Sequence, residues 1–315
     1  MSAPKLPAFE SLLKSRDVED PVNLWVHRPL AYGFVALIYR SAVTPNQITL
    51  LAMLVGITAG ACFIDGSRTA MLWGGALLWA SAILDGADGI LARAQRSFSE
   101  LGRALDGTAD AVVATATVLP AGYHLWVTQH DAGVLVLLLV AIVSAVLHIE
   151  LYDYYKESYL HMTDPHWDGH PERIADAEAR LARAKSEHLG LAARIASSMY
   201  VGLVTAQTRL VALTNPWGSR EQLDFEVSDE SVDIYRRNNR GPMKLWAIIS
   251  LAPHSYMMAI LAMLDQLEIY LWLRLLLANA IFAVVMLWQR RASRRTREQL
   301  SARGLSPVPA LSTPA

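Results

Sequence analysis

The chain has 315 residues, of which 53% are hydrophobic and 18% are charged, and its mean hydropathy is +0.26. This composition excludes an ordinary soluble globular domain and is typical of a polytopic membrane protein. The net charge is −1 and Cys62 is the single cysteine, which excludes an internal disulfide, and we expect no nucleic-acid partner.

The N-terminal part of the chain precedes the apolar segments. Residues 1–21 are polar, lack the apolar core of a signal peptide and are predicted to be a loosely held leader. From about 22 to 40, tryptophan, tyrosine and phenylalanine are mixed with basic residues, which is typical of a helix lying in the membrane interface. Pro45 then suits the first turn of a new helix.

Six apolar segments follow, each near the roughly 20 residues that cross a bilayer. They lie at about 46–64, 70–93, 101–126, 132–154, 243–264 and 267–289. We therefore predict an all-α polytopic membrane protein with six transmembrane helices, an N-terminal interfacial helix and a helical insert between spans four and five.

The insert spans 155–242. Its 172–189 part is charged and rich in alanine, which predicts an exposed helix. Its 190–213 part is more apolar, and we favour an interfacial or packed helix over a seventh span. The predicted divisions of the chain are 1–21, 22–154, 155–242, 243–289 and a basic, then disordered, tail at 290–315.

Charge asymmetry predicts the orientation of the spans. The 94–103 link and the segment from Arg290 are basic, whereas the opposite loops contain almost no cations. The positive-inside rule therefore places both termini and the insert on the cytoplasmic side.

Four aspartates stand out in this apolar sequence. Asp85 and Asp88 are three residues apart, and Asp106 and Asp110 are four apart, so each pair shares one face of a helix. We expect the four carboxylates to meet in one cytoplasm-facing pocket between the second and third spans. They would repel one another unless cations neutralised them, and oxygen ligands suit Mg²⁺ or Mn²⁺. The pattern predicts a metal-assisted phosphoryl-transfer site, with two ions.

The stretch 85–110 also resembles the signature of the CDP-alcohol phosphotransferases (CDP-alcohol phosphatidyltransferases), D-x2-D-G-x2-A-R-x8-G-x3-D-x3-D. The signature positions are filled without departure by Asp85, Asp88, Gly89, Ala92, Arg93, Gly102, Asp106 and Asp110. The resemblance implies a homodimeric membrane enzyme of phospholipid synthesis, with membrane lipids, a CDP-linked donor and an alcohol acceptor as partners. Such an enzyme displaces CMP from the donor by attack of the alcohol hydroxyl.

The resemblance also implies roles for the aspartates. Asp85, Asp88 and Asp106 would hold the metal ions and contribute to binding of the donor. Asp110 would take the proton from the attacking hydroxyl and would also contact one metal ion.

Further roles come with the same resemblance. Gly89 and Ala92 would leave room for the nucleotide, and Arg93 would bind the donor phosphate or nucleotide, for which its forked donors are suited. Gly102 would let the third span pack near the donor. Ser99, in the link between the spans, would donate to the donor phosphates.

The entry to the first span has two interpretations. Family members often carry a similar segment near the cytidine, which would assign substrate contacts to Pro45, Asn46, Gln47 and Thr49. Alternatively, the segment from Thr44 simply starts a helix.

Several functions are compatible with the sequence. We place first the transfer of phosphatidyl from CDP-diacylglycerol to a small hydroxyl acceptor. A close variant, which the signature does not separate, transfers a polar head from a soluble CDP-alcohol to a lipid hydroxyl. We rank lower an intramembrane prenyltransferase, whose aspartate patterns differ, and a non-enzymatic carrier, which would place acidic groups near mid-membrane on several spans.

Three other features have open interpretations. The run of histidines and aspartates at 161–170 lacks helical ligand spacing, so a solvated loop is favoured over a metal site. The basic stretch 235–244 fits either a site for acidic headgroups or an acceptor phosphate, or ordinary positive-inside flanking. His254 and Tyr256 are predicted to be packing residues, with an acceptor-site role as the alternative.

Overall fold

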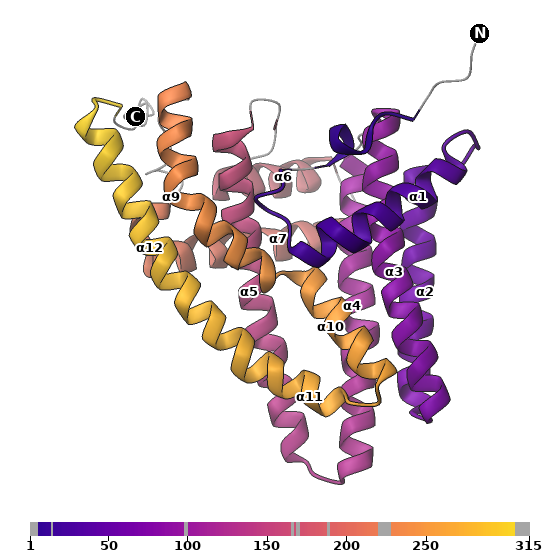
Figure 1. The fold of residues 1–315 in the computed structure, drawn as a ribbon. Coiled ribbons are helices and arrows are strands. Elements are labelled where there is room, and N and C mark those ends of the chain that lie inside the picture. The colour runs from indigo at the N-terminus through magenta and orange to yellow at the C-terminus, as the bar shows by residue number, and fades with distance from the viewer. Residues whose placement is uncertain are drawn as a thin grey trace. The chain divides into compact units, whose positions relative to one another are not determined.

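The structure is a computed structural model that describes residues 6–13, 15–97, 100–164, 167, 171–187, 190–219 and 228–305. Over these residues the chain is helical and contains no strand (Figure 1). Six helical stretches are long and apolar enough to cross a membrane, namely Pro45–Asp65, Arg68–Gln95, Leu105–Gln129, Gly133–Thr163, Asp229–Met263 and Leu267–Ala302. The predicted all-α fold with six spans is therefore confirmed, and the apolar segment near 190–213 is not among the six.

The helices have the following bounds. The first part of the chain forms η1 (Phe9–Leu12), η2 (Asn23–His27), α1 (Arg28–Ile38), α2 (Pro45–Asp65), α3 (Arg68–Gln95), α4 (Glu100–Gln129) and α5 (Gly133–Thr163). The second part forms α6 (Ile174–Ser186), α7 (Leu191–Thr214), η3 (Pro216–Gly218), α9 (Asp229–Ile248), α10 (Leu251–Met263), α11 (Leu267–Trp272), η4 (Leu273–Leu277) and α12 (Ala278–Ala302).

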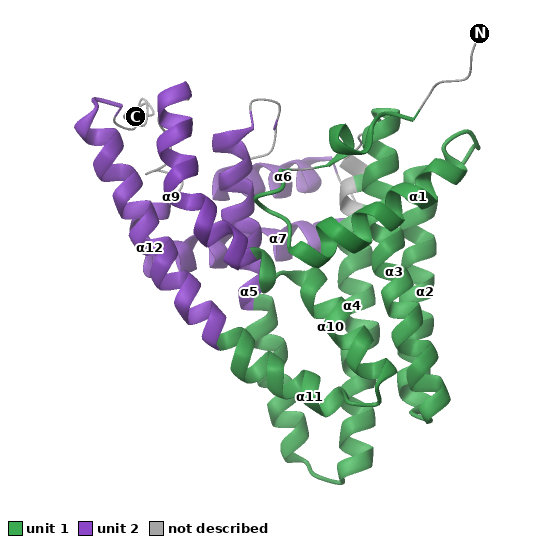
Figure 2. Cartoon of the chain, in the orientation of Figure 1, with its two compact units in different colours: residues 1–146, 247–279 green, residues 147–246, 280–315 purple. Residues whose placement is uncertain are grey.

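The chain divides into two compact units (Figure 2). Unit 1 comprises residues 1–146 and 247–279, and unit 2 comprises residues 147–246 and 280–315. Helices α5, α9 and α12 contribute residues to both units.

Unit 1 is built around α2, which packs against both α3 and α4, while α3 also packs against α1 and α10. Glycines permit two of these approaches. A Cβ atom on Gly60 would lie 1.7 Å from the carbonyl oxygen of Ala116 on α4, and one on Gly75 would lie 2.4 Å from that of Ala259 on α10. The helices therefore meet backbone to backbone, and larger side chains cannot enter these contacts.

The N-terminal segment differs from the prediction of a loosely held leader. Leu12 is 3% exposed and Val18 is 1% exposed. Leu12 belongs to a buried apolar cluster with Ala31, Val35 and Leu91 from helices α1 and α3. The leader is anchored because its few apolar side chains fill a gap beside these helices, a contact that its overall polarity does not reveal.

Unit 2 contains the insert. Helices α6 and α7 pack against each other and coincide closely with the two helices predicted at 172–189 and 190–213. The last part of the predicted insert is also helical, because α9 begins at Asp229 and runs past residue 242. The basic segment after Arg290 continues as helix α12 to Ala302. The part of the predicted disordered tail at 306–315 lies outside the described residues.

A buried polar network ties α9, α12 and the turn after α7 within unit 2. The Asn215 side-chain amide donates to the hydroxyl groups of Tyr155 and Ser293, at 3.1 Å and 2.9 Å. Gln289 donates to the side-chain oxygen of Asn239 at 2.9 Å. Because unpaired buried polar groups are costly, these bonds fix which faces of the helices meet.

Candidate active site

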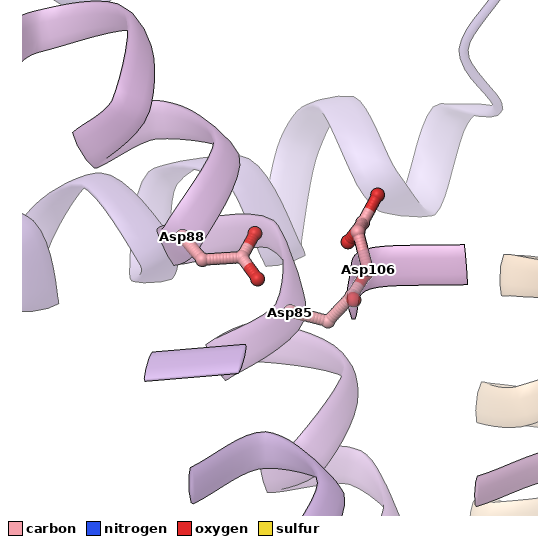
Figure 3. Close-up of side chains that lie close together, drawn as sticks. All are labelled: Asp85, Asp88 and Asp106. Atoms are coloured by element: carbon pink, nitrogen blue, oxygen red, sulfur yellow. The ribbon is translucent and has the colours of Figure 1, made fainter. Parts of the chain in front are cut away.

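Three of the four signature aspartates form an acid cluster, which we define as Asp85, Asp88 and Asp106. One carboxylate oxygen from each lies within 4.8 Å of the others. Figure 3 shows Asp85 and Asp88 extending from one helix towards Asp106 on the other. Asp88 is buried, Asp85 is partly buried and Asp106 is exposed, so the cluster reaches from the protein interior to an open side.

The local fold explains why distant aspartates meet. Asp85 and Asp88 lie in the second half of α3, Asp106 lies in the second turn of α4, and only a short link separates the two helices. The chain therefore reverses, and the end of α3 comes level with the start of α4. Because α2 packs against both helices, it holds them at the spacing that brings the carboxylates together.

The fourth aspartate, Asp110, is not part of this cluster. It lies one turn beyond Asp106 on α4 and is partly buried. The expectation of four carboxylates meeting is therefore met for three. The role of Asp110 as proton acceptor stays a prediction.

The entry to α2 confirms the predicted helix start, whereas the predicted substrate contacts of this segment stay a prediction. The Thr44 hydroxyl accepts from the backbone N–H of Gln47 at 3.4 Å, and the Gln47 side chain accepts from the backbone N–H of Thr44 at 3.0 Å. This is a capping box, with Pro45 in the first turn. Thr49, however, is buried one turn later, and its hydroxyl donates a short hydrogen bond to Asp88. The segment thus starts a helix and also reaches the acid cluster.

Arg93 contacts the N-terminal segment. Its Nε atom donates to the carbonyl oxygen of Leu12 at 2.6 Å. Its Nη2 atom is buried and has no hydrogen-bond partner among the described residues. A Cβ atom on Gly89 would lie 3.4 Å from Arg93 Nη1, so the guanidinium folds back along α3 over this glycine. A buried donor without a partner is costly, and an anionic ligand oxygen would relieve that cost.

The remaining predicted site residues are placed as follows. Ala92 lies near the end of α3 and Gly102 in the first turn of α4, both partly buried, and Asn46 lies in the first turn of α2. Ser99 lies outside the described residues. Their predicted contacts with a donor stay predictions. Of the histidine and aspartate run, residues 165, 166 and 168–170 also lie outside the described residues.

A second group of polar side chains near the N-terminus was missed by the sequence analysis. Glu19 forms a buried ion pair with Arg28 at 2.9 Å, and Arg28 also donates to the carbonyl oxygen of Gly86 at 3.3 Å, one residue after Asp85. The missed signal is the acidic pair before Pro21, directly ahead of the predicted interfacial helix, because a helix start favours such residues.

Asp20 links this group to α10. Its carboxylate accepts from the backbone N–H groups of Val22 and Asn23, each at 3.0 Å, and from the hydroxyl of Tyr256 at 2.9 Å. Burial raises the pKa of Asp20 above its ordinary value, although these hydrogen bonds oppose the shift.

The imidazole ring of His27 packs edge-on against two aromatic rings. These belong to Trp79 and to Tyr256, the residue that donates to Asp20. Burial, aided by the charge of the neighbouring Arg28, lowers the pKa of His27 to about 4. The imidazole is therefore neutral at physiological pH. Tyr256 and the buried His254 are packed within this unit, as the sequence analysis favoured.

Comparison with known proteins agrees with the geometry. Residues 42–177, which include α2, α3, α4 and the whole signature, match the family model described as CDP-alcohol phosphatidyltransferase. A CDP-diacylglycerol–serine O-phosphatidyltransferase from Mycobacterium tuberculosis is 27% identical over 222 residues, which are 70% of this chain and 68% of that protein. Residues 42–177 therefore form a CDP-alcohol phosphatidyltransferase domain that carries the acid cluster at its signature, in a chain with six helices long and apolar enough to span a membrane; enzymes with this domain are metal-dependent and transfer substituted phosphate groups.

Proposed function

We propose that this enzyme transfers the phosphatidyl group of CDP-diacylglycerol to the hydroxyl group of a small alcohol and releases CMP. The observation that carries the proposal is the meeting of Asp85, Asp88 and Asp106 within 4.8 Å on two membrane helices inside the family domain. The mycobacterial relative is named for this donor and for serine as acceptor. Serine is therefore the first acceptor to test.

The acid cluster fits a hard divalent cation, because its ligands are carboxylate oxygens from three side chains that would otherwise repel one another. We infer that it holds Mg²⁺ or Mn²⁺, and that two ions bind when the donor is present. A bound cation would neutralise the donor diphosphate and the charge that develops on the leaving CMP.

The chain's own residues would supply position and a proton acceptor. Asp110 would take the proton from the acceptor hydroxyl as its oxygen attacks the phosphorus of the phosphatidyl group. The bond from that phosphorus to the bridging oxygen of the diphosphate then breaks, and CMP leaves with the bonding electron pair. Arg93 would offer its unpartnered Nη2 to a phosphate oxygen, and Thr49 would hold Asp88 in place.

We further propose that the acid cluster, both termini and the insert lie on the cytoplasmic side, and that the enzyme is a homodimer. The basic 94–103 link and the basic start of the tail support the orientation. Single-cysteine labelling tests it. With Cys62 replaced by serine, a cysteine at Ser186 on α6 should resist a membrane-impermeant thiol reagent in intact cells and react after lysis. Labelling in intact cells would overturn the orientation.

The function itself is tested with purified enzyme, CDP-diacylglycerol and a panel of small alcohols, by following CMP release and the lipid product. We expect release that requires an acceptor and a divalent cation. Unchanged release after complete chelation would reject the metal role. Product from a soluble CDP-alcohol and diacylglycerol, with none from CDP-diacylglycerol, would instead establish the reversed transfer.

A further inference from the structure

A cavity within unit 2 lies between α9 and α12, in a part of the chain that the signature does not reach. Its volume is about 340 Å³. The residues that define it are Arg237, Asn238 and Gly241 from α9, and Trp288, Arg291 and Arg295 from α12. We call it the arginine cavity.

The charged side chains that line the arginine cavity are all positive. Arg237, Arg291 and Arg295 line it, and no acidic side chain does. Two neighbouring arginines do have acidic partners: Arg294 on α12 pairs with Glu298 at 3.3 Å, and Arg303, just after α12, pairs with Glu230. For the three lining arginines, the described part of the chain provides no such ion pair. Three guanidinium groups around one space repel one another, and an anion between them would offset that repulsion because it attracts all three.

The cavity sits where both helices change from apolar to basic sequence. The apolar run from Leu267 ends at Trp288, close to the roughly 20 residues that span a bilayer, and basic residues begin at Arg290. On α9, the basic stretch precedes Leu245, where the apolar sequence begins. Tryptophan is enriched at membrane boundaries, and basic clusters there attract anionic headgroups.

Trp288 forms one wall of the cavity. A Cβ atom on Gly241 would lie 2.5 Å from Cζ2 of Trp288, so the indole ring rests against the backbone of α9. Val284 and Leu287, one turn or less before Trp288 on α12, are 56% and 60% exposed. An apolar surface therefore adjoins the basic lining across this tryptophan.

We propose that the arginine cavity binds the headgroup of an anionic phospholipid. The headgroup phosphate would accept hydrogen bonds from the guanidinium groups of Arg291, Arg295 and Arg237, whose paired donors match phosphate oxygens. The acyl chains would lie along the exposed apolar side chains of α12. This proposal does not depend on the transfer reaction. A free phosphate ion could accept the same hydrogen bonds from the arginines but could not make the acyl-chain contacts.

The test counts lipids retained by the purified full-length chain in detergent, by native mass spectrometry, with phosphatidylglycerol or phosphatidylcholine added. EDTA is present, because a metal-free acid cluster repels an anionic lipid and cannot account for its binding. We expect a preference for phosphatidylglycerol. Arg291→Gln and Arg295→Gln should each weaken its retention about fivefold, since a basic residue near a membrane surface contributes about 1 kcal/mol.

The matched control is Arg290→Gln, which removes the same charge from an exposed position on α12 that does not line the cavity. It should retain phosphatidylglycerol as the wild type does. Equal retention of the two lipids, or equal losses in all three variants, would overturn the proposal.

Two further measurements use the unmodified protein. Raising the salt concentration should reduce the preference for phosphatidylglycerol, because exposed charges are screened, and a preference insensitive to salt would count against the arginines. Inorganic phosphate is then titrated calorimetrically. Binding of phosphate without any preference for the anionic lipid would identify a site for a soluble anion and reject the lipid headgroup.

Discussion

The hydroxyl of Thr49 on α2 donates a hydrogen bond to the carboxylate of Asp88 on α3, and both side chains are buried. The bond crosses between two membrane helices and restricts the rotation of one member of the acid cluster. A carboxylate that is already oriented loses less conformational freedom when it binds a cation. Thr49 is therefore a positioning residue that acts through Asp88.

Thr49→Val should raise the divalent cation concentration needed for half-maximal activity by about tenfold, because it removes a hydrogen bond to a charged group while keeping the shape. Thr49→Ser should restore most of the loss. The control is Thr58→Val on the same helix, where the hydroxyl donates only to the carbonyl oxygen of Leu54 at 2.8 Å. Identical metal titrations for Thr49→Val and Thr58→Val would show that the bond to Asp88 is unimportant.

Asp110→Asn and Asp85→Asn should fail in different ways. Asp85 belongs to the acid cluster and Asp110 does not. We expect Asp85→Asn to weaken binding of the metal and the donor, and Asp110→Asn to lose turnover by about 100-fold or more with donor binding largely kept, as for loss of a general base. Calorimetry with a CDP-linked donor and Mn²⁺ measures this difference. Equal losses of donor affinity would contradict the division of roles.

The sequence predicts the acid cluster well because helical periodicity fixes which side chains share a face. Asp85 and Asp88 at a spacing of three, followed by a short link and Asp106, leave few arrangements for two antiparallel membrane helices. The same reasoning does not separate Asp110 from the cluster. Its position relative to the other three depends on how α4 packs against its neighbours, which spacing along the chain does not give.

The N-terminal contacts could not be predicted in this way. The bond from Arg93 to Leu12 joins residues far apart in sequence, and one of its two atoms is a main-chain oxygen. The polar composition of residues 1–21 predicts a loosely held leader. A few buried side chains, such as Leu12 and Val18, nevertheless anchor it. Such packing depends on the shape of the gap beside α1 and α3, which no local pattern records.

Gly60→Ala should lower the thermal unfolding midpoint of the purified protein, because its Cβ would lie 1.7 Å from a backbone oxygen of α4 that cannot move alone. Overpacking of this kind costs about 1–3 kcal/mol or more. Gly33→Ala on α1 is the control, since nothing lies within 4 Å of its added Cβ, and alanine there should be neutral or stabilising. Equal midpoints for both variants would mean that α2 and α4 are not in close contact.

Asp20→Asn should raise the unfolding midpoint at neutral pH. Because burial raises the pKa of Asp20, its contribution to stability is fully present below the pKa of the unfolded chain and is lost as pH rises through the folded value. Asparagine keeps an acceptor for Tyr256 and the helix start without the charge. The gain should vanish in acid, where Asp20 is protonated.

Asp20→Ala provides the comparison for this pH series, because it removes the acceptor as well as the charge. It should be less stable than Asp20→Asn at every pH. A lower midpoint for Asp20→Asn than for the wild type at neutral pH would show that the ionised carboxylate favours folding despite its burial.

The bond between Arg93 and the carbonyl oxygen of Leu12 has a consequence for genetics. Every residue at position 12 carries that oxygen, so a screen of single substitutions can alter the packing there but cannot delete the hydrogen-bond acceptor itself. Insertions and deletions can move the acceptor away from Arg93, because the length of chain between Leu12 and the Glu19–Arg28 ion pair determines the position of the Leu12 carbonyl oxygen. One-residue insertions and deletions between positions 12 and 19 should therefore lower enzyme activity more than single substitutions at the same positions.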